Sequence, residues 1–275
     1  MSKPIVVGID GGPGNDIALH WAIAEAAQRS VPLMVLHADE EWSTSVVRTG
    51  SVLEATSKSA RKLVDDAVAV VQAMNRDIHV SSVISPNHPA DALISWATDA
   101  SMLVLGNRGR SALSAAVRGS VGASVVAQAR CPVIIARTMP PRSAPVVVGV
   151  DGSPASKAAV AFAFGYAAQH MSGVRAVHVW HRSVLPGAGD LPAQRRAHLR
   201  VVTETLADAQ QRHPNVPAWT VSTIGNAHEF LAEESMRAQL VVVGTHGRGA
   251  RSGMLLGSVS QALLRNASSP LAVIP

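Results

Sequence analysis

Two segments of the chain share one spacing of glycine and serine, in which Gly-x2-Gly is followed nine residues later by Gly-Ser. Their members are Gly106, Gly109, Gly119 and Ser120 in the first segment and Gly244, Gly247, Gly257 and Ser258 in the second. Glycines expose backbone N–H groups to a bulky anion, and Gly-Ser at a helix start adds a hydroxyl and the positive end of the helix dipole. A single copy would be an ordinary turn and helix cap. Its recurrence favours a site for a nucleotide or another anion.

Two aspartates stand at corresponding places earlier in the sequence, each followed by glycine. Asp10 precedes Gly11, and Asp151 precedes Gly152. A carboxylate at such a place accepts hydrogen bonds from sugar hydroxyls, ligates a metal or shapes the turn beside the glycine. We expect both aspartates to face the glycine segments, which favours the sugar or metal role.

The repetition extends along the whole chain. The nine residues 4–12 match residues 145–153 at six positions with an offset of 141, and residues 103–110 resemble 241–248 with an offset of 138. Two copies of one domain follow, residues 1–138 and 139–275, joined by a proline-containing linker near residues 137–144.

Each copy alternates short apolar runs with longer segments of helical periodicity. Strands are expected near 4–9, 32–37, 78–84, 102–106 and 132–136, and near 145–150, 174–180, 217–223, 239–243 and 271–274. Helices are expected near 14–29, 51–74, 88–99 and 119–129, and near 154–171, 190–212, 226–237 and 257–267. Continuously apolar strands are covered on both faces, which predicts an α/β fold: a doubly wound parallel sheet in each copy. Ligands bind such sheets beyond the carboxyl ends of the strands, where the aspartates and glycine segments lie.

Composition excludes several classes of protein. The 275 residues are 47% hydrophobic and 16% charged, which is typical of a globular chain and not of a disordered one. The single cysteine, Cys131, forms no internal disulfide and is expected to fill a small core position. Neither a signal peptide nor an apolar run of about 18 residues is present. We therefore expect a cytoplasmic protein without a membrane partner.

The net charge of +5 lies entirely in the second copy. Residues 1–138 contain 12 basic and 12 acidic side chains, and residues 139–275 contain 12 and 7. The arginine cluster of Arg195, Arg196 and Arg200 is interpreted as a solvated helix face, because no aromatic residues are interleaved with it for stacking on bases. Nucleic acid is therefore not the expected partner.

These motifs resemble those of the universal stress protein family in its tandem form. The resemblance rests on the two glycine segments, on Val-Gly-Val-Asp-Gly-Ser at residues 148–153 and on Gly-Ser-Val-Ser at residues 257–260. It covers nearly the whole chain. It implies a five-stranded parallel sheet in the order 3-2-1-4-5 in each copy, an ATP site where the strand order reverses, with Mg²⁺ accompanying the nucleotide, and a homodimer.

Carried onto this sequence, the resemblance assigns each part of the nucleotide. Asp10 and Asp151 lie on the ribose side, and the main chain of Ala38 and Val179 meets the adenine. The resemblance also implies that eight residues of the glycine segments hold the phosphates: Gly106, Gly109, Gly119, Ser120, Gly244, Gly247, Gly257 and Ser258. The backbone of Val121 and Val259 lies just behind them. The first copy departs at two positions, having Gly12 in place of Ser153 and Asn87 in place of Gly225.

The resulting hypothesis is an ATP-binding stress-response regulator with little or no catalytic turnover and no catalytic residues. The alternative is a slow ATP hydrolase or nucleotidyl transferase, which needs a general base near the phosphates. Only the second glycine segment offers a histidine, His246. P-loop and dinucleotide-binding motifs are absent from the sequence, and no Cys/His cluster has metal-site spacing. The remaining histidines, His178 and His181 among them, are expected to serve packing or surface roles.

Overall fold

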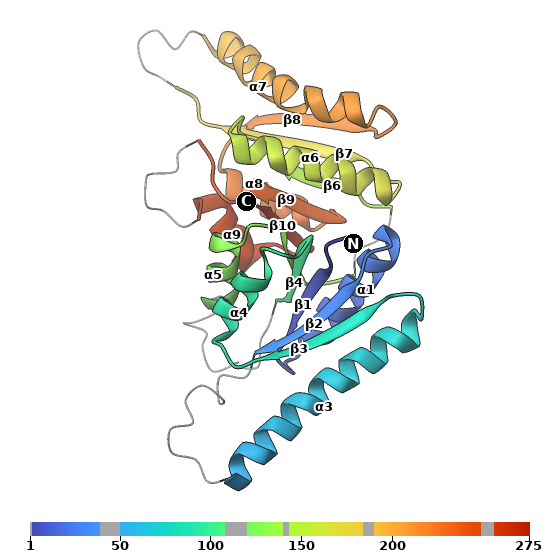
Figure 1. The fold of residues 1–275 in the computed structure, drawn as a ribbon. Helices are drawn as coiled ribbons and strands as arrows, with labels where there is room; N and C mark the ends of the chain where they lie inside the picture. Colours follow the sequence, from blue (N-terminus) through green and yellow to red (C-terminus); the bar gives the residue numbers. More distant parts are fainter. Residues whose placement is uncertain (1, 39–49, 108–119, 140–142, 184–189, 249–255) are drawn as a thin grey trace. The chain divides into compact units, whose positions relative to one another are not determined.

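The computed structural model describes residues 2–38, 50–107, 120–139, 143–183, 190–248 and 256–275, and Figure 1 shows their fold. The chain forms two compact units, Met1–Arg137 and Thr138–Pro275. Every expected strand and helix is present in the structure, within a few residues of its expected bounds.

The first unit contains five strands and four helices among its described residues. The strands are β1 (Ile5–Ile9), β2 (Leu33–Ala38), β3 (Val80–Ser85), β4 (Met102–Gly106) and β5 (Val133–Ala136), and the helices are α1 (Asn15–Arg29), α3 (Gly50–Met74), α4 (Pro89–Trp96) and α5 (Ser120–Gln128). These five strands pair in parallel, in the order β3-β2-β1-β4-β5. Helices α1 and α3 pack against each other, as do α4 and α5.

The second unit repeats this plan. Its strands are β6 (Val146–Gly149), β7 (Val174–Trp180), β8 (Ala218–Ile224), β9 (Leu240–Gly244) and β10 (Leu271–Ile274), and its helices are α6 (Pro154–Gln169), α7 (Leu191–Arg212), α8 (Ala227–Ser235) and α9 (Ser258–Asn266). Hydrogen-bonded neighbours give the order β8-β7-β6-β9-β10, again parallel throughout. Counted within each unit, both orders are 3-2-1-4-5, as the resemblance predicts.

Strands β4 and β5 of the first unit and β9 and β10 of the second are buried along almost their whole length. Four residues of β4 and all four residues of β5 are buried, as are the corresponding residues of β9 and β10. This accounts for their unbroken apolar sequences, since helices cover both faces of a parallel sheet. Cys131 lies in the first core at 5% exposure, and burial raises the pKa of its thiol to about 11. The expected core role of this cysteine is confirmed.

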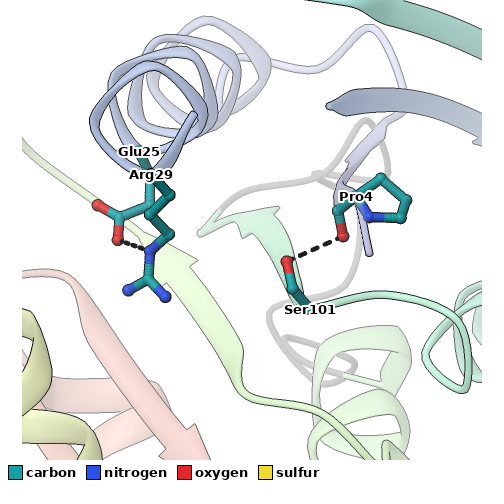
Figure 2. A network of polar contacts seen from close by, with 4 residues as sticks. All are labelled: Pro4, Glu25, Arg29 and Ser101. Atoms are coloured by element: carbon teal, nitrogen blue, oxygen red, sulfur yellow. Dashed lines mark hydrogen bonds and ion pairs between the residues drawn. The ribbon is translucent and has the colours of Figure 1, made fainter. Parts of the chain in front are cut away.

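Figure 2 shows two polar contacts of the first unit, one within α1 and one between the segments that lead into β1 and β4. Glu25 is a buried acidic side chain of α1, 1% exposed, and it pairs with Arg29 one helical turn later. The Ser101 hydroxyl, just before β4, donates to the carbonyl oxygen of Pro4, just before β1, across 3.1 Å. Pairing keeps the buried carboxylate compensated, because an isolated buried charge would be costly.

Candidate functional site

The turn after the first strand is built in the same way in both units. The carboxylate Oδ1 of Asp10 accepts from the amide of Gly12 at 2.8 Å, and that of Asp151 accepts from the amide of Ser153 at 2.9 Å. The glycines between them, Gly11 and Gly152, have φ values of 74° and 78°. Side chains rarely adopt this left-handed region, which is why glycine follows each aspartate. The role of turn former, one of the three considered for these aspartates, is therefore present in both units.

Each of these turns is also tied to the start of the following helix. The amide of Asp10 donates to Asn15 Oδ1 at 3.0 Å, and the amide of Asp151 donates to Ser156 Oγ at 3.2 Å. Ser153 caps α6 by accepting from the amide of Ser156. Helix α1 begins after Gly14 and, within the described residues, has no such side-chain cap. The first copy, which has Gly12 in place of Ser153, therefore lacks the serine cap of the second.

The glycines that end β4 and β9 allow a helix to approach the sheet closely. A Cβ at Gly106 would stand 2.7 Å from the carbonyl oxygen of Gly14, and one at Gly244 would stand 2.7 Å from Cβ of Ala155. Real Cβ atoms essentially never come so near. Gly106 and Gly244 thus bring the N-terminal turns of α1 and α6 against the ends of these strands.

In the second unit, Asp151 holds the loop after β9. Its Oδ2 accepts from the amide of Arg248 at 2.8 Å. A Cβ at Gly247 would lie 2.4 Å from the same oxygen, so the contact requires glycine there. The guanidinium of Arg248 lies over the turn, with Nη2 2.8 Å from where a Cβ of Gly152 would be. Asp151, Gly152, Gly247 and Arg248 therefore form one cluster, which we call the Asp151 latch.

The start of α9 adjoins the same loop. The amide of Gly257 donates to the Thr245 carbonyl oxygen at 2.8 Å, and Ser260 Oγ donates to the Gly244 carbonyl oxygen at 2.6 Å. Gly257 is the N-cap residue, and within the described part of the chain it provides no side-chain hydrogen bond to the helix. The first turn of α9, which includes Ser258 and Val259, thus meets the Thr245–Gly247 loop with its positive dipole end.

The ends of β2 and β7 carry histidines that are bonded to the neighbouring first strands. His37 Nδ1 is 2.9 Å from the Ile9 carbonyl oxygen, and His178 Nδ1 is 2.6 Å from that of Val150. Each histidine directly precedes a residue expected at the adenine, Ala38 or Val179. These bonds fix the spacing between the strand end and the aspartate turn that follows β1 or β6.

The sequence matches a known family along nearly its whole length. The model of the universal stress protein family matches residues 1–137 and 143–275. The chain belongs to the universal stress protein family. Universal stress protein Rv2005c of Mycobacterium tuberculosis (strain ATCC 25618 / H37Rv) is 38% identical to it, covering 99% of both chains. Universal stress protein Rv2623 of the same organism is 37% identical, covering 99% of this chain and 96% of the relative.

A solved structure shows the same fold over the full length. The crystal structure of a universal stress protein from Archaeoglobus fulgidus DSM 4304 has a TM-score of 0.74 and 19% identity, covering 100% of this chain and 96% of the other. In this universal stress protein, no helix within the described residues is long and apolar enough to cross a membrane. The same residues contain no group of three or more His, Cys, Asp or Glu side chains suited to a metal ion.

The expected site residues of this universal stress protein divide into three groups. Asp151, Gly244, Gly247, Gly257 and Ser258 lie on the turn after β6, the end of β9 and the start of α9, which hydrogen bonds and close approaches connect. Val179 belongs to the same unit and lies near the end of β7. Asp10, Ala38 and Gly106 lie at the equivalent strand ends of the first unit, and Val121 lies in the first turn of α5, as Val259 does in α9. Gly109 and Gly119 lie outside the described residues, as does the side chain of Ser120.

Three residues beside this site were not singled out as ligand-site candidates. His178 Nε2 is 2.9 Å from His198 Nδ1, and the His198 ring stacks on Trp180 with a centroid distance of 4.2 Å. The sequence predicts a packing or surface role for His178, and the residue is buried at 5% exposure. In addition, each of its two ring nitrogens takes part in a hydrogen bond. One feature of the sequence points to His178: it lies 141 residues after His37, the same offset that separates Asp10 from Asp151.

Proposed function

We propose that this universal stress protein is a regulator that binds an adenine nucleotide, ATP with Mg²⁺ in the first place, in each of its two units. The observation that carries the proposal is the position of the Asp151 latch. Strand β6 pairs with β7 on one side and with β9 on the other, so the order of strands reverses beside it. Doubly wound sheets bind their ligands in the crevice at the carboxyl end of such a switch point.

The residues around the switch point supply the contacts that a nucleotide needs. Asp151 would meet the ribose, and the Val179 main chain at the end of β7 would meet the adenine. The phosphates would lie between the amides of the Gly247 loop and the N-terminal turn of α9, where the helix dipole favours anions. Asp10, Ala38, Gly106, Gly109, Gly119, Ser120 and Val121 would do the same in the first unit.

Mg²⁺ would be held mainly by the nucleotide itself. Both carboxylate oxygens of Asp151 accept backbone amides, and the described residues offer no cluster of three acidic, histidine or cysteine side chains. Magnesium commonly binds through one or two carboxylates together with substrate phosphates. We therefore assign no protein cage to the metal, and the nucleotide would bring it.

The test is the nucleotide content of the purified protein. We expect binding in the micromolar range, about 8 kcal/mol, at two sites per chain. Gly247→Val places a side chain against Asp151 Oδ2 and should remove the second site, leaving one nucleotide per chain. Mass spectrometry of the molecules released by denaturation identifies and counts the ligand. Gly165→Ala, where a Cβ would meet nothing within 4 Å, is the matched control. Unchanged content in the Gly247 variant would rule out the second site.

The absence of committed chemistry is part of the proposal. A hydrolase would need a group that activates water beside the phosphates, and the sequence places only His246 in the second loop. We expect turnover of ATP with Mg²⁺ to stay far below about 1 s⁻¹, the lower end of ordinary enzyme rates. A faster rate that is lost in His246→Ala would favour the enzyme alternative.

We also propose a homodimer, because the family resemblance implies one. Light scattering on the purified protein should give twice the mass of a single chain. A mass equal to one chain at micromolar concentration would exclude it.

A further inference from the structure

A chain of hydrogen bonds in the second unit leads from the end of β6 to helix α7. The carbonyl oxygen of Val150 can only accept, so His178 donates from Nδ1, and its Nε2 is the acceptor while the ring is neutral. His198 Nδ1, 2.9 Å away, must then be the donor. A neutral His198 is therefore left with an acceptor at Nε2, the atom that gains a proton when the ring becomes charged.

The position of His198 is fixed by aromatic packing. Its ring is nearly parallel to that of Trp180, at 15° and 4.2 Å between centroids. Trp180 is in turn held by donation from Nε1 to Ser222 Oγ at 3.2 Å. His198 is therefore oriented by two strands, β7 and β8, and is not a freely rotating surface histidine.

The charged groups around His198 come from several elements. Burial lowers the pKa of His198, and His178 on β7 and Arg248 after β9 lower it further because they disfavour a charge on the ring. The backbone of Arg248 is bonded to Asp151, at the turn after β6. Arg195 is an exposed neighbour three residues earlier on α7. Strand β8 has no charged side chain, and α6 has Lys157 alone. Arg248 thus lies at the Asp151 latch and also acts on the charge of His198.

We propose that His198 is a positioning residue of the second nucleotide site, acting through its hydrogen bond to His178, and that this site takes up a proton at His198 when it binds an anionic nucleotide. The inference rests on the proposed nucleotide binding. A phosphate-bearing ligand at the Asp151 latch would bring negative charge beside the Arg248 guanidinium. That charge would offset the repulsion which Arg248 exerts on a protonated His198, so ligand and proton would favour each other.

The first unit has only half of this arrangement. His37 makes the equivalent bond to Ile9, but His198 corresponds to Ser57 at the offset of 141 and to Ala60 at the offset of 138. Neither side chain can titrate near neutral pH. The proton linkage is therefore a property of the second unit, and the first unit serves as an internal reference.

The experiment is titration calorimetry of the full chain with Mg-ATP, in a Gly109→Val background that removes the first site. Measured in buffers of different ionisation enthalpy near pH 6, the heats give the number of protons taken up with the nucleotide. We expect a clear fractional uptake, and affinity that rises as pH falls from 7.5 to 5.5. The gain would approach tenfold, the limit reached when the pH lies below both values, if binding raises the His198 pKa by one unit.

Two variants separate titration from packing. His198→Asn retains a donor toward His178 but cannot titrate, and should bind nucleotide without proton uptake or pH dependence. His198→Phe preserves the stack on Trp180 and should lose the uptake as well. His181→Phe, an exposed histidine in the same unit, should behave like the parent protein. Binding with no proton uptake in the parent, or with equal uptake in His198→Asn, overturns the inference and leaves the proposed function intact. Failure to bind any nucleotide overturns both.

Discussion

Asp151 uses both carboxylate oxygens within its own unit, one on the turn after β6 and the other on the loop after β9. Each bond is from a backbone amide to a charged acceptor, the stronger class of protein hydrogen bond. The residue that the family resemblance places at the ribose thus also assembles the loop expected to hold the phosphates. Loss of the carboxylate should affect the protein even before any ligand is added.

Asp151→Asn tests this double role. The amide retains one acceptor oxygen but turns an NH₂ toward the other backbone N–H, so one hydrogen bond to the carboxylate is lost. We expect the free energy of unfolding to fall by about 1–3 kcal/mol. Urea unfolding measures the change, and Asp208→Asn, at an exposed position on α7, is the control. If both variants unfold at the same urea concentration, the latch does not stabilise the unit.

His198 should make the stability of the ligand-free protein sensitive to acid. Burial, His178 and Arg248 lower its pKa in the folded state, whereas the unfolded chain binds a proton near the ordinary value. Below that value the unfolded state therefore holds more protons than the folded state. As the pH is lowered, the free energy of unfolding falls until the folded ring is protonated as well. Between pH 7.5 and 5.5, we expect the free energy of unfolding to decrease less in His198→Phe than in the parent protein. A decrease identical to that of the parent protein would contradict the assignment.

At the scale of elements, the strand-terminal glycines set how closely the helices approach. Gly244 leaves no room for a side chain beside Ala155 at the start of α6, whereas Gly165 within α6 has open space where its Cβ would be. We expect Gly244→Ala to cost about 1–3 kcal/mol of unfolding free energy by overpacking. Gly165→Ala should gain up to about 1 kcal/mol from helix propensity. Opposite shifts in thermal midpoint would show both effects, and equal shifts would contradict them.

The elements themselves could be predicted because their signals are local. Buried strands such as β9 read as unbroken apolar runs, and Gly257 marks where α9 begins. The sequence predicts that Asp151 faces the second glycine segment, but it does not predict the bond to Arg248, which joins residues 97 positions apart through a backbone amide that every residue except proline has. The bond between His178 and His198 could not be predicted for a related reason. Each histidine alone is compatible with packing, and it is the fold that brings α7 against β7.

For the whole molecule, the duplication explains why so much of the second unit is anticipated by the first. The aspartate turn, its glycine with positive φ and the histidine bond to the first strand all occur twice. Charge does not follow this symmetry, because the acidic and basic residues balance in the first copy and leave +5 in the second. The two aspartate turns, which are similar in backbone geometry, thus belong to copies of different net charge.

This asymmetry predicts a different salt dependence for the two sites. An anionic nucleotide is attracted over a distance set by screening, which shortens from about 30 Å at 0.01 M salt to about 10 Å at 0.1 M. The second site, within the basic copy, should lose more affinity than the first over this range. Titrations of Gly109→Val and Gly247→Val isolate the second and first sites in turn. Parallel slopes of affinity against salt would mean that the excess charge lies too far from the ligand to act on it, and that the second copy's arginines serve another surface.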